Sequence, residues 1–72
     1  MKAIEVKVEI NSESFRANRG VDGSVIIDKW NQSGGFWEWA GTGKWTSCVE
    51  GCTANIGDAA YAAIDDAITE AE

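Results

Sequence analysis

The sequence predicts an α+β fold in a single domain, residues 1–72, with an antiparallel sheet of four to five strands and one C-terminal helix packed on one face. Three observations predict this class. Residues 3–10 alternate between apolar and charged side chains, the pattern of a half-buried strand. Short β-branched and aromatic runs follow, separated by turn-forming glycine and asparagine. The last segment is rich in alanine and carries apolar residues at helical spacing.

The first three strands are predicted at residues 3–10, 15–19 and 24–30. In the second, Phe15 and Ala17 point inward, and the Asp22-Gly23 turn leads into the third. In the third, Trp30 shares a face with Ile26 rather than with the neighbouring apolar side chains. Either face of this strand can therefore be the buried one.

The next strand is predicted at residues 36–40, between glycines, with Trp37 and Trp39 on the same face. Glycines at 41 and 43 predict a turn into a fifth strand at residues 44–49. Both a simple meander and a rearranged strand order fit this pattern.

The helix is predicted at residues 56–71, with Asn55 as its N-cap. One side forms an apolar stripe that can pack against the face of the first strand that carries Ile4 and Val8. Carboxylates lie on the opposite side: Asp58, Asp65, Asp66, Glu70 and Glu72. Acids at the C-terminal end oppose the helix dipole, which hints at a functional reason for them.

The charge of the chain is uneven. The net charge is −6, yet acids and bases nearly balance as far as Glu50, whereas only acids follow Gly51. Such a surface repels nucleic acid and anionic membranes and attracts basic partners. There is no apolar segment that reads as a signal peptide or a membrane span, so we expect a cytoplasmic protein that binds no membrane.

The sequence offers little for catalysis or for a cofactor. There is no histidine, so the usual general base of a nucleophile is missing. Cys48 and Cys52 are too few to hold a structural metal ion and are expected to be reduced thiols. Residues 41–44 lack the spacing of a phosphate-binding loop. We therefore expect no enzyme, no cofactor and no metal.

Tryptophan supports a second kind of site. Trp37, Trp39 and Trp45 can form an aromatic platform for a peptide or a carbohydrate, because flat rings give contact area at low entropic cost. Packing in the core is the competing interpretation, and we favour it for at least two of the four tryptophans. One helix covers only part of such a sheet, and the uncovered part would need a second molecule. We therefore also expect a homodimer.

At the level of class, the chain resembles the small acidic proteins that bacteriophages encode against host machinery, including the anti-CRISPR proteins. The resemblance lies in size, a strand-rich fold with one helix, absent catalytic residues and a face lined by carboxylates. It implies an inhibitor that mimics DNA charge and occupies a basic surface of a nucleic-acid-binding protein. Asp66 and Glu70 lie roughly 6 Å apart along a helix, close to the roughly 7 Å spacing of phosphates. The five helix carboxylates would then bind the partner, and the alternatives are the aromatic platform and a homodimeric assembly protein.

Overall fold

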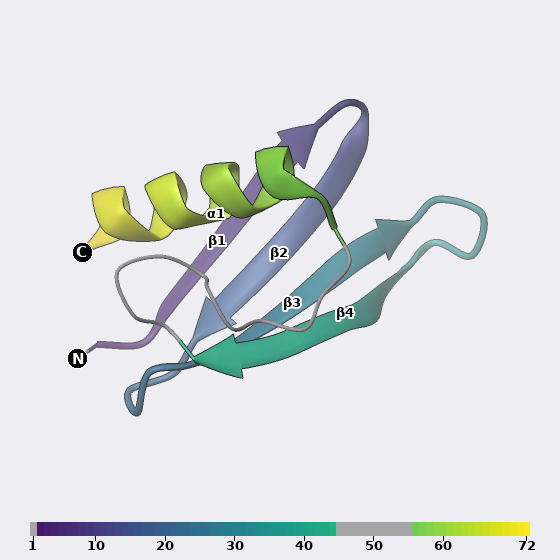
Figure 1. Cartoon of the computed structure of the whole chain (residues 1–72). Coiled ribbons are helices and arrows are strands. Elements are labelled where there is room, and N and C mark those ends of the chain that lie inside the picture. The colour runs from purple at the N-terminus through teal and green to yellow at the C-terminus, as the bar shows by residue number, and fades with distance from the viewer. Residues whose placement is uncertain (1, 45–55) are drawn as a thin grey trace.

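A computed structural model of the chain describes residues 2–44 and 56–72. These residues form four strands and one helix: β1 (Ile4–Ile10), β2 (Glu13–Arg19), β3 (Ser24–Asn31), β4 (Phe36–Lys44) and α1 (Asp58–Ala71). Neighbouring strands pair antiparallel in the order β1-β2-β3-β4, a simple meander (Figure 1). The predicted α+β class is confirmed, and so is the single antiparallel sheet with a C-terminal helix.

The connection from β1 to β2 is tighter than predicted. Asn11 and Ser12 alone form the turn, both with positive φ, at 52° and 66°. Positive φ at both central residues is the condition for the turn whose twist matches that of a hairpin. Because the turn takes only two residues, β2 begins at Glu13 rather than at residue 15.

The predicted turn at residues 41–43 is wrong. These residues continue β4 to Lys44, and Gly41 pairs with Ile27. The register shifts between Ile27 and Asp28, so that Ala40 is left as the extra residue of a β-bulge. Glycine is common beside a bulge within a strand, which is why the glycines at 41 and 43 were wrongly predicted to form a turn. The remainder of the predicted fifth strand, residues 45–49, lies outside the described residues.

The helix begins two residues later than predicted. Gly57 is its N-cap, with φ 88° and ψ 156° and no side-chain capping bond. Asn55, the predicted cap, lies outside the described residues. The predicted apolar stripe is confirmed at its centre, because Ala60, Ile64 and Ile68 are the buried residues of α1.

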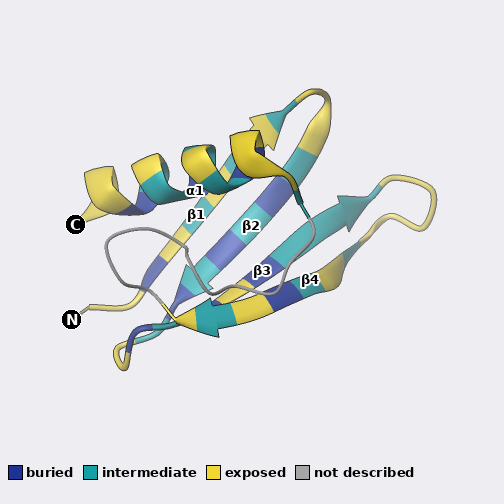
Figure 2. Cartoon of the chain, in the orientation of Figure 1, coloured by how far each residue is buried: buried dark blue, intermediate teal, exposed yellow. Residues whose placement is uncertain are grey.

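The core lies on one face of the sheet. Helix α1 packs against β1 on that face, as expected from the apolar side chains of β1 (Figure 2). The core consists of aliphatic residues and one phenylalanine from three strands and the helix: Ile4, Phe15, Ala17, Val25, Ile27, Ala60, Ile64 and Ile68. The position of Trp30 left open which face of β3 is buried. The buried face is the one that carries Val25 and Ile27, and Ile26 points away from the core.

The β3–β4 hairpin extends beyond the rest of the sheet (Figure 1). Pairing between β2 and β3 ends at Phe15 and Lys29, whereas pairing between β3 and β4 continues to Asn31 and Phe36. Trp30 and its partner Trp37 therefore lie in a two-stranded part of the sheet. Such a segment is weakly stable by itself and depends on its side-chain contacts.

Candidate binding face

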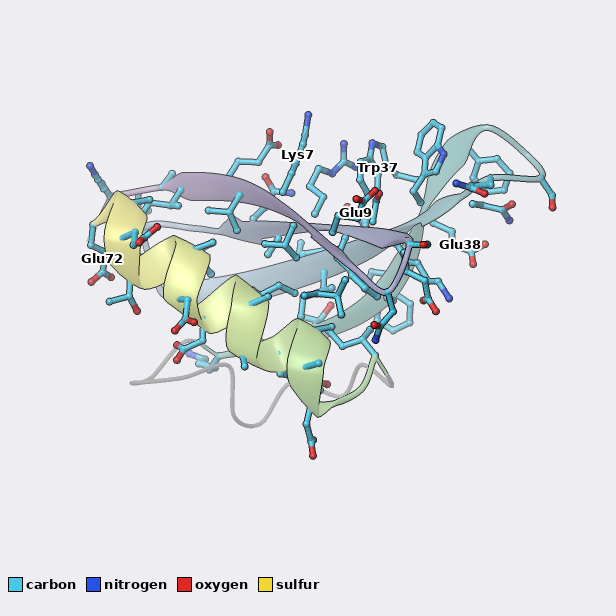
Figure 3. The ribbon with its side chains drawn as sticks, turned by 90° about the horizontal axis from the view of Figure 1, so that it is seen from above. Lys7, Glu9, Trp37, Glu38 and Glu72 are labelled. Carbon is cyan, nitrogen blue, oxygen red and sulfur yellow. The ribbon has the colours of Figure 1, made fainter. Side chains whose placement is uncertain are left out.

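Residues that alternate with the core positions form a second face of the sheet, which we call the open face. Helix α1 lies on the other side, and no described element covers the open face; the labelled Lys7 and Trp37 project from it in Figure 3. Its side chains follow from the strand register: Glu5, Lys7, Glu9, Ser14, Arg16, Asn18, Ser24, Ile26, Asp28, Trp30, Trp37, Trp39, Thr42 and Lys44.

Where the β3–β4 hairpin leaves the rest of the sheet, the open face carries a cluster of aromatic and charged side chains. The rings of Trp30 and Trp37 meet edge to face, with centroids 5.3 Å apart and an interplanar angle of 70°. The guanidinium carbon of Arg16 lies 4.7 Å from the centroid of the Trp37 ring, within the range of a cation–π contact. The Nε and Nη2 atoms of Arg16 both donate to Oδ2 of Asp28, at 3.2 and 3.0 Å. These contacts link β2, β3 and β4 and hold Trp37 in place.

Trp39 is the most exposed ring of the cluster. It is 64% exposed, and its indole Nε1–H donates to Oγ1 of Thr42 at 2.9 Å. In a regular strand these two residues would point to opposite faces, because they are three positions apart. The bulge at Ala40 shifts the alternation by one and brings both to the open face. The bulge thus fixes the orientation of an exposed ring, as bulges near functional sites often do.

Of the three tryptophans in the predicted platform, Trp37 and Trp39 lie together on the open face, and Trp45 lies outside the described residues. Trp30 joins them on this face, and its shared face with Ile26 was the sequence signal for a further member of the platform. None of these three rings belongs to the buried core, so the expectation that at least two of the four tryptophans are core residues is wrong.

The opposite side of the hairpin carries a different set of side chains. Lys29 forms an ion pair with Glu13 at 2.9 Å, and this hydrogen bond raises the pKa of Lys29. Asn31 donates to Glu38 at 3.2 Å. Phe36 also lies on this side and is 49% exposed, which makes it a natural control for Trp39.

The five predicted helix carboxylates differ in their exposure and in their contacts. Asp58, Asp66 and Glu70 are exposed. Asp65 is half-buried, and its Oδ1 atom is buried without accepting a hydrogen bond from a described residue. Glu72 accepts a hydrogen bond from Nη1 of Arg19.

The Arg19–Glu72 contact gives a structural reason for an acid at the end of the helix. Arg19 lies on the core side of β2 with a side chain only 1% exposed, and its Nη2 donates to the carbonyl of Lys2 at 2.8 Å. A buried cation needs a charged partner or several hydrogen bonds. Glu72, at the end of α1 in Figure 3, supplies the partner and ties the helix end to the sheet.

Charge is divided between the two sides of the molecule. The open face carries three acids and three bases, Glu5, Glu9, Asp28 and Lys7, Arg16, Lys44, so its formal charge is zero. The whole net charge of −6 therefore belongs to the rest of the chain. The sequence showed the excess of acids near the C-terminus but not that the tryptophan side is neutral.

Within residues 2–44 and 56–72, no group of three or more potential metal ligands is placed to hold an ion. No helix of this part of the chain is long and apolar enough to cross a membrane. Cys48 and Cys52 lie outside the described residues. Comparison with known proteins finds no matching family model, no matching curated protein and no matching solved structure.

Proposed function

We propose that this chain is a non-enzymatic binding module that docks a peptide or protein partner on its open face. One observation carries the proposal: three tryptophans lie together on the side of the sheet that α1 does not cover, and Trp39 is 64% exposed. Large exposed aromatic side chains gathered on one surface favour a partner.

The composition of the face supports this choice. Binding energy in protein interfaces is concentrated in tryptophan, tyrosine and arginine near the centre, while charged residues form the rim. The open face carries residues of these types, Arg16, Trp30 and Trp37, where the β3–β4 hairpin leaves the sheet, and charged side chains of β1 lie at one margin. The contacts of Arg16 with Asp28 and Trp37 fix these groups before a partner arrives, which lowers the entropic cost of binding.

The ring arrangement favours a peptide or protein over a carbohydrate. Stacking along a sugar chain needs flat ring faces that are free and roughly aligned. Here Trp30 and Trp37 stand at 70° to each other, and Arg16 covers a face of Trp37. Trp39 remains as a single exposed ring, better suited to fill a pocket or to contact an apolar side chain.

A selection from a displayed peptide library on the immobilised protein tests this proposal. Selected peptides should lose about tenfold or more in affinity for Trp39→Ala, since loss of a hot-spot tryptophan commonly costs about 2 kcal/mol, or about thirtyfold. Phe36→Ala is the matched control, because this ring is similarly exposed on the other side of the same hairpin. Equal losses for the two variants would contradict the assignment of the face.

Acidic mimicry of DNA is a second candidate, supported by the net charge and by three exposed helix acids, Asp58, Asp66 and Glu70. It would have the protein bind a basic surface of a nucleic-acid-binding protein in the cytoplasm and inhibit it, without binding nucleic acid itself. Because Glu72 accepts a hydrogen bond from Arg19, fewer helix carboxylates are available to bind such a partner.

The mimicry candidate is tested by reversing the charges of Asp66 and Glu70 to lysine. A partner captured from lysate on the parent protein should then be lost, and DNA should compete with it for the parent. Capture that is unchanged by the double reversal would remove this candidate without affecting the open-face proposal.

A further inference from the structure

We propose that the partner on the open face is a second copy of this chain, so that two sheets pack face to face in a two-fold symmetric dimer. This inference rests on the proposed function of that face and names its occupant. Closed two-fold dimers use the same surface patch on both copies, so the patch must complement itself.

Charge restricts where two copies can meet. Each copy carries a net charge of −6, and the described residues outside the open face, eight acids and three bases, account for −5 of it. Most other approaches therefore bring like charges together, above all those through the acidic helix. The open face has no net charge, and it also carries the exposed apolar side chains of Ile26 and Trp39.

The register of the sheet makes one two-fold arrangement complementary. One row of side chains crosses all four strands in the order Lys7, Arg16, Asp28, Trp39. A two-fold axis parallel to the strands and midway between β2 and β3 reverses this row. Lys7 then faces Trp39 of the second copy, and Arg16 faces Asp28 of the second copy.

Both contacts of this arrangement are attractive. An ammonium group over an indole ring forms a cation–π contact, and a guanidinium group pairs with a carboxylate. A two-fold axis perpendicular to the strands would instead set Lys7 against Lys7 and Asp28 against Asp28. The order of charges along the row thus selects the first arrangement.

The face has about the area that a small dimer needs. Four strands spaced about 4.8 Å apart, each with about seven residues rising 3.3 Å, cover roughly 450 Å² before the relief of side chains is added. Stable interfaces bury about 800 Å² of accessible surface per partner, so nearly the whole face must take part. We expect a weak dimer, with a dissociation constant of about 10–100 µM.

Sedimentation equilibrium of the full chain, from about 5 to about 500 µM, tests the dimer. Trp39→Ala should raise the dissociation constant about tenfold or more, and Phe36→Ala should change it by less than about twofold. Lys7→Glu should raise it about fivefold. Lys2→Glu is its control, because it changes the net charge equally at an exposed residue outside the open face. Circular dichroism checks that each variant is folded.

The salt dependence of the dissociation constant is a second measurement, and the acidic-mimicry candidate predicts the opposite sign for it. Screening relieves the long-range repulsion between two acidic copies, whereas the Arg16–Asp28 contacts, which the dimer would exclude from solvent, are screened much less. The dimer should therefore tighten several-fold as sodium chloride rises from about 0.02 to about 0.5 M. A complex held by the acidic helix on a basic partner would weaken over the same range. A dimer that weakens with salt overturns the proposed arrangement.

The outcomes separate this inference from the function it rests on. A chain that stays monomeric throughout overturns the dimer, while peptides that bind in a Trp39-dependent manner would keep the open face as a binding site. A dimer that is indifferent to both Trp39→Ala and Lys7→Glu uses another surface and also overturns the inference. A monomer that selects no Trp39-dependent peptide removes both proposals.

Discussion

The pairing of Arg19 with Glu72 predicts that two acids at the end of one helix differ sharply in their effect on stability. Glu72 bonds the buried guanidinium of Arg19, whereas Glu70 is exposed, and no described cation forms an ion pair with it. We therefore compare Glu72→Gln with Glu70→Gln, which remove the same charge two residues apart. The first should destabilise the fold, and the second should not.

The magnitude follows from the exposure of the pair. Hydrogen bonds to charged groups contribute about 1.5–3 kcal/mol to stability. The side chain of Glu72 is 44% exposed, so solvent screening places its contribution near the low end, about 1.5 kcal/mol. Neutralising an acid near the C-terminal end of a helix recovers about 0.5 kcal/mol. Glu72→Gln should thus lower the free energy of unfolding by about 1 kcal/mol, and Glu70→Gln should raise it slightly.

Urea denaturation followed by circular dichroism measures both variants against the parent chain. For a domain of this size, 1 kcal/mol corresponds to a fall of about 4–8 °C in the thermal midpoint. If Glu72→Gln and Glu70→Gln gave the same free energy of unfolding, Arg19 would not depend on Glu72. The acids at the end of the helix would then again lack a structural reason, and their role in partner binding would gain weight.

Three further predictions follow from single contacts. Arg16→Lys keeps the charge but loses the planar stacking on Trp37 and the paired donors, so it should lower the free energy of unfolding by about 1 kcal/mol in urea titrations; an unchanged midpoint would contradict this. Gly57→Ala should cost about 1–2 kcal/mol by the same assay, because φ 88° with ψ 156° is a glycine conformation, and no steric clash would add to the cost. Asp22 accepts hydrogen bonds from the backbone N–H and the hydroxyl of Ser24, which lower its pKa, so its carboxylate stabilises the fold at neutral pH and this contribution is lost as pH falls through the lowered pKa. Asp22→Asn should therefore lower the thermal midpoint near pH 7, and the difference from the parent should narrow as pH falls below the usual pKa of an aspartate.

The parts of the fold that follow from local periodicity were predictable. The alternation of β1 and the apolar stripe of α1 both reflect one buried side, which is what such patterns report. The antiparallel class followed from short strands joined by turns. The site was harder, because Phe36, Trp37 and Trp39 are all apolar and their alternation does not show which face is buried.

Two features could not be read from the sequence, for different physical reasons. The bulge at Ala40 depends on how β4 pairs with β3, a non-local property, and glycine-rich strands and glycine-rich turns look alike in sequence. The Arg19–Glu72 contact joins residues 53 positions apart, and a charged side chain at an inward position is recognised only when its partner is known. In both cases, contacts between residues that are not neighbours in the sequence override the local structural preference.

The bulge also connects the fold with the proposed binding face. From Thr42 onward, β4 keeps the alternation set by Gly41 against Ile27, whereas the residues before Ala40 follow the opposite alternation. If Ala40 were accommodated without a bulge, Trp37 and Trp39 would point toward the helix side, and Phe36 and Glu38 would take their places. That side of the hairpin carries the ion pair of Lys29 with Glu13 and lies outside the buried core. One extra residue in β4 therefore places two large rings on the neutral side of an acidic protein rather than beside this ion pair.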